Sequence, residues 1–154
     1  MKLYLVQHGE ALDKAIDPDR PLSEHGHRDI DRLAGFLEGR RRVSRVLHSG
    51  KSRARQTADR LQQAMAPDGM AEAVSGLGPN DTVAPWQQML TGLNEDQLVV
   101  GHLPFMDRLV ALLVSGDEHA SLVEFRPGSM ACLESDDKGH WRILWMIRPE
   151  LLRD

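Results

Sequence analysis

The sequence has one cysteine, no long apolar run and no excess of basic residues. Cys132 has no second cysteine to pair with, so an internal disulfide is excluded. No apolar run approaches the roughly 20 residues that a membrane-spanning helix requires, and the apolar stretch after Lys2 is too short for a signal peptide. The net charge of -4 argues against general binding to nucleic acids. These absences predict a cytoplasmic protein with no membrane or nucleic-acid partner.

The composition is that of an ordinary globular protein. The chain has 154 residues, of which 41% are hydrophobic and 27% are charged, a balance typical of a soluble protein with a buried core. A chain of this length is usually one domain, so we expect residues 1–154 to form one folded unit. Cys132 lies in an apolar run that reads as a strand, where a buried thiol fits better than a catalytic one.

Histidines follow two apolar runs that we predict to be strands. Residues 3–6 are four consecutive apolar residues, which suits a strand buried on both faces, and His8 lies just beyond them. The apolar run at 97–101 ends in the same way, at His102. Ligands of open α/β sheets bind outside the carboxyl ends of the strands, so we expect both histidines at one edge of the sheet. The alternative for each is a strand-end histidine that bonds to a loop.

An arginine follows a third predicted strand, at 45–49. A helix is expected over 52–65, with Ser52 as a plausible N-cap and Arg53 in the first turn. A cation at that end of a helix opposes the dipole, which favours anions there. Binding of an anion therefore explains Arg53 better than a structural role does, although a surface arginine remains the alternative.

The remaining periodicity predicts an α/β fold. We expect a three-layer α/β/α sandwich around a mostly parallel mixed sheet, with the first strand near the middle and the last two strands antiparallel. A helix beginning at Ser23 is expected to end near Gly39, and a third helix is expected to include 86–90, with Asn80 and Asp81 as turn or cap residues. The other expected elements are a helix after Pro104 and strands at 71–74, 129–134 and 141–147.

Three short motifs follow the predicted strands in chain order: His8-Gly9, Ser49-x-x-x-Arg53-Ala54-x-Gln56-Thr57 and Gly101-His102-x-Pro104. Together they resemble the histidine phosphatase superfamily, also called phosphoglycerate mutase-like. The short chain and the segment Arg20-Pro21-Leu22-Ser23-Glu24-His25-Gly26 resemble more closely its SixA-type protein phosphohistidine phosphatases. The resemblance extends from residue 1 to about residue 145.

This resemblance implies a phosphatase that works without a cofactor or a metal. His8 would attack the phosphorus and carry the phosphoryl group, while Arg53 and protonated His102 would stabilise the charge on its oxygens. A metal site of His8, His102 and Glu10 is conceivable by residue type, but no ligand spacing on one element supports it. The implied phosphate-binding set is Gln7, His8, Gly9, Arg53 and His102.

The sequence departs from the family at Gln7, where the family has an arginine directly before the nucleophilic histidine. An amide donates N–H bonds to phosphate oxygens but supplies no charge. By analogy with the removal of an oxyanion donor, the loss would cost on the order of 10²- to 10³-fold in rate. We expect Lys51, Arg20 or Arg55 to be the candidates for replacing the charge.

The chain between Arg53 and His102 is short and leaves little length for a lid. An open site suits a phosphoryl group on a protein surface better than a small sugar phosphate. The only nearby candidates for a general acid are Glu72 and Asp81, and neither lies in a recognisable motif. The lack of a clear general acid also favours a substrate with a P–N bond, because this bond breaks more readily than that of an alkyl ester.

Three functions follow as alternatives. The first is a phosphatase for phosphohistidine on a histidine-containing phosphotransfer protein, with inorganic phosphate as product. The second is a phosphomonoesterase for a small metabolite. The third is a phosphate- or phosphohistidine-binding module in which Gln7 has ended catalysis. The sequence leaves the oligomeric state open.

Overall fold

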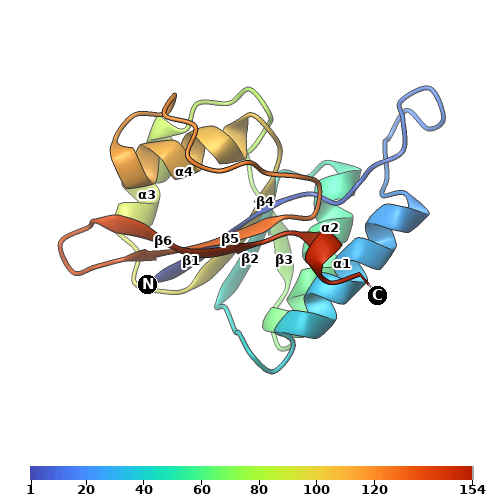
Figure 1. Cartoon of the computed structure of the whole chain (residues 1–154), viewed down its shortest axis with the longest axis horizontal. Helices are drawn as coiled ribbons and strands as arrows, with labels where there is room; N and C mark the ends of the chain where they lie inside the picture. Colours follow the sequence, from blue (N-terminus) through green and yellow to red (C-terminus); the bar gives the residue numbers. More distant parts are fainter. Residues whose placement is uncertain (154) are drawn as a thin grey trace.

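A single mixed sheet with helices on both faces forms the protein (Figure 1). The structure is a computed structural model and describes residues 1–153. Over these residues the elements are β1 (Lys2–Gln7), α1 (Glu24–Leu37), β2 (Arg45–His48), α2 (Ser52–Met65), β3 (Ala71–Ala73), α3 (Ala84–Thr91), β4 (Gln97–Gly101), α4 (Phe105–Ser115), β5 (Met130–Ser135), β6 (Trp141–Ile147) and the 3-10 helix η1 (Pro149–Leu151).

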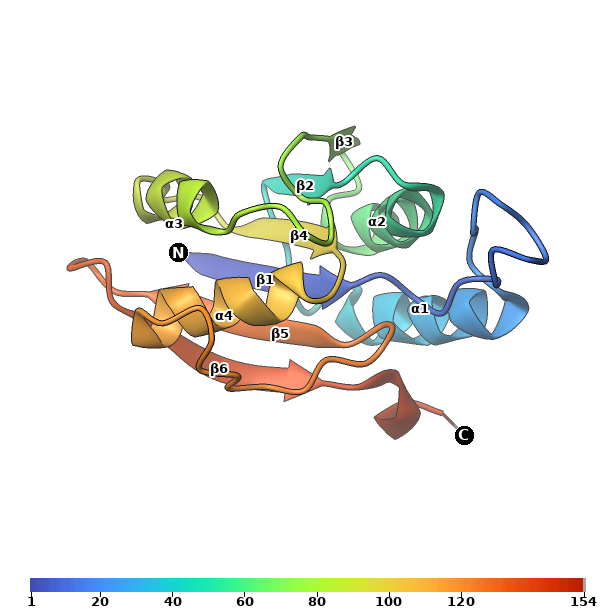
Figure 2. The same ribbon diagram turned by 90° about the horizontal axis from the view of Figure 1, so that it is seen from above.

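The strand order is β3-β2-β4-β1-β5-β6, which confirms that the first strand lies inside the sheet (Figure 2). The strands β3, β2, β4 and β1 are parallel, whereas β5 runs antiparallel to both β1 and β6. Gln7 is paired with Gly101, and His48 with Val100. The carboxyl ends of β1, β2 and β4 therefore meet at one edge, as the sequence predicted.

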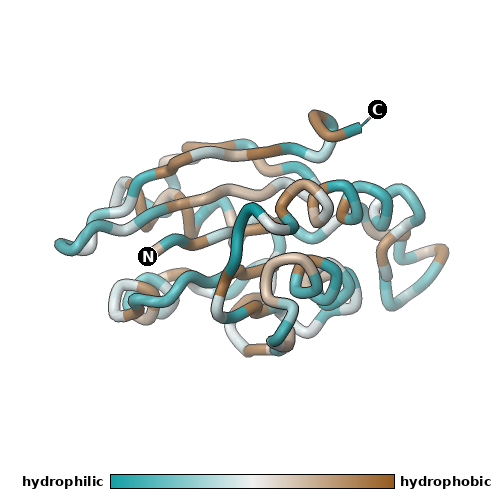
Figure 3. Tube along the Cα trace, turned by 90° about the horizontal axis from the view of Figure 1, so that it is seen from below, coloured by the Kyte–Doolittle hydropathy of each residue, from teal (hydrophilic) through white to brown (hydrophobic). Residues whose placement is uncertain are grey.

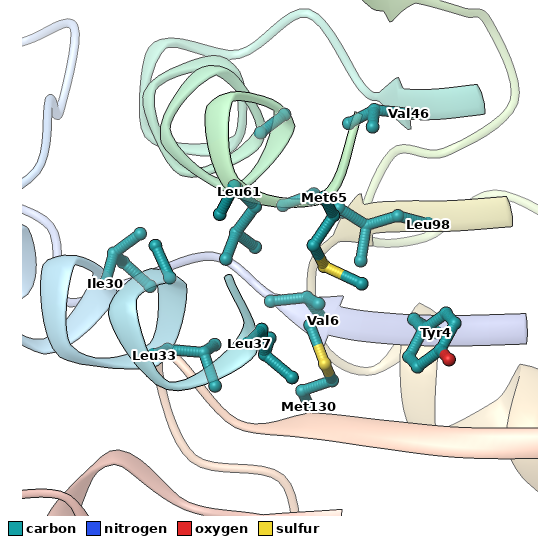
Figure 4. Packing of buried hydrophobic residues seen from close by; sticks show 14 of the residues in the cluster. Tyr4, Val6, Ile30, Leu33, Leu37, Val46, Leu61, Met65, Leu98 and Met130 are labelled. Atoms are coloured by element: carbon teal, nitrogen blue, oxygen red, sulfur yellow. The ribbon is translucent and has the colours of Figure 1, made fainter. Parts of the chain in front are cut away.

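Alternate residues of the strands face two separate cores. Tyr4 and Val6 of β1 pack with α1 and α2 (Figure 4), whereas Leu3 and Leu5 pack with α3 and α4 on the other face. All four side chains are at most 1% exposed. Burial on both faces is the reason that β1 reads as a continuous apolar run. The predicted three-layer α/β/α sandwich is confirmed.

Charged and polar residues gather where the chain leaves the core. The turn between β5 and β6 forms a hydrophilic tip (Figure 3).

No helix within residues 1–153 is both long and apolar enough to cross a membrane. Cys132 is buried in β5, as predicted.

Helix starts are the least accurately predicted feature. The N-cap of α1 is Ser23, whose side chain accepts a hydrogen bond from Gly26 N, as expected. The predicted range of α2, 52–65, is confirmed, but its predicted N-cap was wrong: Ser52 is the first helical residue, and the N-cap is Lys51, which makes no side-chain cap bond. Helix α3 begins at Ala84 after Val83, since the candidate cap Asp81 instead accepts a bond from Gly78 N.

Candidate active site

The backbone of His8 is held at the carboxyl end of β1 from two sides. Its N–H donates to the carbonyl oxygen of Gly101, at 3.0 Å, and its own carbonyl accepts from Gly128 N, at 3.1 Å. The first contact continues the pairing with β4, and the second comes from the segment that precedes β5. His8 is only 8% exposed, so the ring has little freedom to move.

One hydrogen bond determines which nitrogen of His8 is free. Nδ1 lies 2.7 Å from the carbonyl oxygen of Gly9. A carbonyl only accepts, so Nδ1 carries the hydrogen and Nε2 keeps its lone pair. Arg53 Nε–H points at that Nε2 from 3.3 Å. Nε2 thus keeps the lone pair that a nucleophile needs, and here that lone pair accepts the hydrogen bond from Arg53, the residue that we expect to bind the phosphoryl oxygens.

Thr57 connects the loop after β1 to helix α2. Its Oγ1 accepts from Gly9 N, at 3.0 Å, and donates to the carbonyl oxygen of Arg53, at 2.8 Å. A Cβ at Gly9 would lie 3.0 Å from Cγ1 of Ile30 and 3.3 Å from the carbonyl oxygen of Gly26, so a larger residue here would make its neighbours shift. The buried hydroxyl of Thr57 therefore fixes the relative position of His8 and Arg53.

His102 faces His8 from the end of β4. The centroids of the two rings are 5.0 Å apart and the rings are tilted by 53°. Nε2 of His102 lies 2.6 Å from Ser49 Oγ, at the end of β2. Its Nδ1 is buried and has no hydrogen-bond partner among the described residues. The structure thus brings three strand ends together, as the sequence predicted.

Ser49 and Thr57 are contacts that sequence reasoning did not single out. Both belong to the segment Ser49-x-x-x-Arg53-Ala54-x-Gln56-Thr57, so their positions in that motif were the available signal. Gln56 of the same segment accepts a bond from Leu22 N, at 2.7 Å. The motif thus supports the site through hydrogen bonds to two other loops.

Both histidines are neutral at pH 7. Burial lowers the pKa of His8 to about 4, and the cations Arg53 and Arg20 add to this although the Gly9 carbonyl opposes it. Burial also lowers the pKa of His102, to about 3, and the further contributions come, in decreasing order, from His8, Arg53, Lys51 and Arg20. We expected a protonated His102 from the sequence. That expectation is wrong for the protein by itself, because among these protein groups the ring is neutral. A phosphoryl dianion beside it would raise its pKa.

The three candidates for replacing the missing arginine differ in their position. The charge of Arg20 lowers the pKa of both site histidines, and the charge of Lys51 lowers that of His102. The charge of Arg55 instead lowers the pKa of His48. Arg20 has a φ of 47°, and its Nε donates to the carbonyl oxygen of Leu12, at 3.1 Å. Of the three, Arg20 is thus the cation whose charge acts on both histidines, although Lys51 acts more strongly than Arg20 on His102.

Gln7 itself is only 8% exposed, and its Oε1 is buried with no hydrogen-bond partner among residues 1–153.

The two candidate general acids have other contacts. Glu72 Oε2 lies 2.6 Å from Arg45 Nη2, and Asp81 Oδ2 accepts from Gly78 N at 2.7 Å. Glu10 Oε1 accepts from Ser23 Oγ, at 2.8 Å. No three His, Cys, Asp or Glu side chains of the described part gather as a metal-binding group.

Comparisons of the sequence with known proteins identify its relatives. The family model of the histidine phosphatase superfamily (branch 1) matches residues 3–73. Phosphohistidine phosphatase SixA of Escherichia coli (strain K12) is 30% identical over 155 residues, which cover 97% of this chain and 94% of that protein.

Solved structures extend the likeness to the whole fold. A protein histidine phosphatase SixA complexed with tungstate has a TM-score of 0.86 and 29% identity, covering 99% of this chain and 100% of its own. Phosphoserine phosphatase of Entamoeba histolytica in complex with phosphoserine has a TM-score of 0.75 at 15% identity, with 99% of each chain covered. The second likeness shows the fold alone. On the sequence relationship and the shared fold, the chain belongs to the histidine phosphatase superfamily.

Proposed function

We propose that this protein is a phosphatase that removes the phosphoryl group from phosphohistidine on another protein. The observation that carries the proposal is the unprotonated Nε2 of His8, 3.3 Å from Arg53 Nε, with Nδ1 held by the Gly9 carbonyl. The relative from Escherichia coli, which bears the name phosphohistidine phosphatase, supports the same substrate chemistry.

In the first step the lone pair of His8 Nε2 attacks the phosphorus in line with the P–N bond of the substrate. A new P–N bond to His8 forms, and the electron pair of the old bond passes to the leaving imidazole, which takes up a proton from solvent, or from His102 once the phosphoryl dianion has raised the pKa of that ring and protonated it. Arg53 and His102 stabilise the equatorial oxygens of the transferring group. An imidazole is a better leaving group than an alkoxide, so this step does not need a strong general acid.

In the second step a water molecule attacks the phosphorus of phospho-His8. The P–N bond breaks, inorganic phosphate leaves and His8 Nε2 regains its lone pair. The bond from Nδ1 to the Gly9 carbonyl keeps Nε2 as the reacting atom in both steps. No step requires a metal, because cationic side chains neutralise the phosphoryl charge.

We infer that Arg20 supplies the charge that Gln7 lacks. Its guanidinium acts electrostatically on His8 and on His102, and the left-handed backbone at Arg20 is a strained conformation of the kind that clusters at functional sites. Gln7 would still donate its amide N–H to a phosphoryl oxygen.

The test compares two classes of substrate. A phosphorylated histidine-containing phosphotransfer domain and p-nitrophenyl phosphate are each incubated with the wild type and with His8→Ala, and phosphate release is followed. We expect a higher kcat/KM for the phosphorylated domain and no turnover by the variant. Preference for the ester would favour a small-molecule phosphatase instead. Phosphate binding without turnover of either substrate would favour a binding module.

A further inference from the structure

The loop between β1 and α1 is an ordered projection beside the active site. Its base is closed by a bridge between Ala11 and Leu22 and by a bond of 2.8 Å from Leu12 N to the carbonyl oxygen of Pro21. Arg20, whose charge acts on His8, lies in this base. Figures 1 and 2 show the loop projecting beyond the N-terminal end of α1, on the side toward which β1 points.

The tip of this loop presents an isoleucine to solvent. Ile16 is 73% exposed, although its N–H donates to the carbonyl oxygen of Asp13 at 2.9 Å, as does that of Asp17 at 3.0 Å. The tip is thus a series of hydrogen-bonded turns that hold Ile16 outward. Removing such an apolar side chain from water is favourable, and no segment of the described chain does so.

An apolar residue of the loop after β4 lies beside the same site. Leu103, which follows His102 directly, is 38% exposed. Exposed apolar side chains around a functional site are typical of protein interaction surfaces.

The charge of the loop indicates which partner surface fits it. Asp13 and Asp19 are exposed and Asp17 is half-buried, whereas the cations of the loop are Lys14 at the tip and Arg20 in the base. An acidic rim around an apolar anchor complements a surface with an apolar patch and basic side chains. A small phosphorylated metabolite would reach His8 without touching Ile16, whereas a folded protein carrying the phosphoryl group would meet the loop.

We propose that the loop of residues 11–21 is a docking element for the histidine-phosphorylated substrate protein, with Ile16 as its apolar anchor and its aspartates facing basic residues near the phosphohistidine. This inference rests on the proposed function. It assigns the loop to binding of the protein that carries the phosphoryl group, separately from the chemistry at His8.

The test measures steady-state kinetics of Ile16→Ala and Ile16→Asp. The substrates are a panel of phosphorylated histidine-containing phosphotransfer domains and p-nitrophenyl phosphate. The matched control is Met70→Ala, since Met70 is 79% exposed and lies next to Ala71, the first residue of β3, at the opposite end of the sheet. Thermal unfolding of each variant checks that the fold is unchanged.

Truncation of an apolar anchor at an interface costs more than about 1 kcal/mol, so Ile16→Ala should raise KM for the phosphorylated domain roughly 5- to 10-fold. Ile16→Asp should raise it further, kcat should stay within about twofold, and Met70→Ala should resemble the wild type. Turnover of p-nitrophenyl phosphate should not change.

Three contradicting results are distinguishable. If the wild type hydrolyses a phosphorylated domain and the Ile16 variants have the same KM, the docking role of the loop is wrong and the proposed function stands. If the wild type hydrolyses none of the phosphorylated domains, both proposals fail together. Equal losses on p-nitrophenyl phosphate would assign Ile16 to the active site itself and overturn the docking role.

Discussion

At the scale of single residues, the reactivity of the site depends on where one proton resides. The Gly9 carbonyl holds it on Nδ1 of His8, and burial keeps a second proton from joining at Nε2. Burial makes charging the ring costly, while the nearby guanidinium of Arg53 makes it costlier still. The same groups that would bind a phosphoryl dianion therefore keep the nucleophile neutral.

The dependence of activity on pH should reflect this burial. The pKa of His8 is lowered to about 4, so the ring remains neutral well below the ordinary histidine range and protonates only near that value. We expect kcat/KM for phosphohistidine substrate to fall on the acid side near pH 4. A profile measured with short assays, to limit spontaneous loss of the acid-labile phosphoryl group, checks this. Loss of activity centred near pH 6.5, the ordinary value for histidine, would contradict it.

The lack of a positive charge at position 7 should limit the rate. Gln7→Arg adds a cation that can bind a phosphoryl group through two hydrogen bonds, so we expect kcat to rise by about 10-fold or more, within the 10²- to 10³-fold cost of a missing donor. Arg20→Met should lower kcat/KM by a similar factor, and adding Gln7→Arg to it should recover most of the loss. Steady-state kinetics of the two single variants and the double variant measure this. An inactive Gln7→Arg protein with an unchanged Tm would show that the amide is preferred here.

At the scale of elements, the first turn of α1 packs directly on the loop that follows the nucleophile. Gly26 is buried in that turn, and a Cβ at this position would collide with the carbonyl oxygen of Glu10. Ser23 bonds to both the backbone and the side chain of Glu10. Helix α1 thus helps to fix the course of the chain beyond His8.

Two glycines of α1 provide a matched comparison. Gly26→Ala should destabilise the protein by about 1–3 kcal/mol, in the range of overpacking changes, and should lower activity because the Glu10 backbone must move. Gly35→Ala meets nothing within 4 Å and should stabilise the helix by about 0.5–1 kcal/mol. Urea unfolding of both variants measures the difference. Equal stabilities would mean that the contact with Glu10 yields without cost.

The elements themselves were largely predictable because each strand has a local signal. The apolar runs ending at His8 and His102 fixed two strand ends, and helical periodicity located α1 and α2. What the sequence could not supply were contacts made by distant segments, such as the bond from Gly9 N to Thr57. The N-cap of α2 and the start of α3 were also missed, since neither helix has a side-chain cap. Such contacts depend on how elements pack and leave no local pattern.

At the scale of the whole molecule, burying two neutral histidines couples folding to pH. The folded-state pKa values of His8 and His102, about 4 and about 3, lie below the value of 6.5 for an unperturbed histidine. Between those values the unfolded chain binds more protons than the folded chain. The free energy of unfolding therefore falls as the pH decreases from about 6.5 toward 4.

Denaturation across this pH range should show that slope. Each histidine contributes at most about 1.4 kcal/mol per pH unit, so His102→Asn should flatten the dependence relative to the wild type. Urea unfolding at several pH values measures it. His119→Asn serves as the control because the side chain of His119 is 71% exposed. An equal slope in the wild type and in His102→Asn would mean that the ring is not held neutral by burial.

The most direct test of the account is to trap the phosphorylated enzyme. The wild type and His8→Ala are mixed rapidly with a ³²P-phosphohistidine domain, quenched in alkali at short times and analysed for label on the protein. The account predicts transient, acid-labile label on His8 that decays as phosphate appears, and none on the variant. Phosphate release without labelled enzyme, or undiminished turnover by His8→Ala, would contradict catalysis through His8.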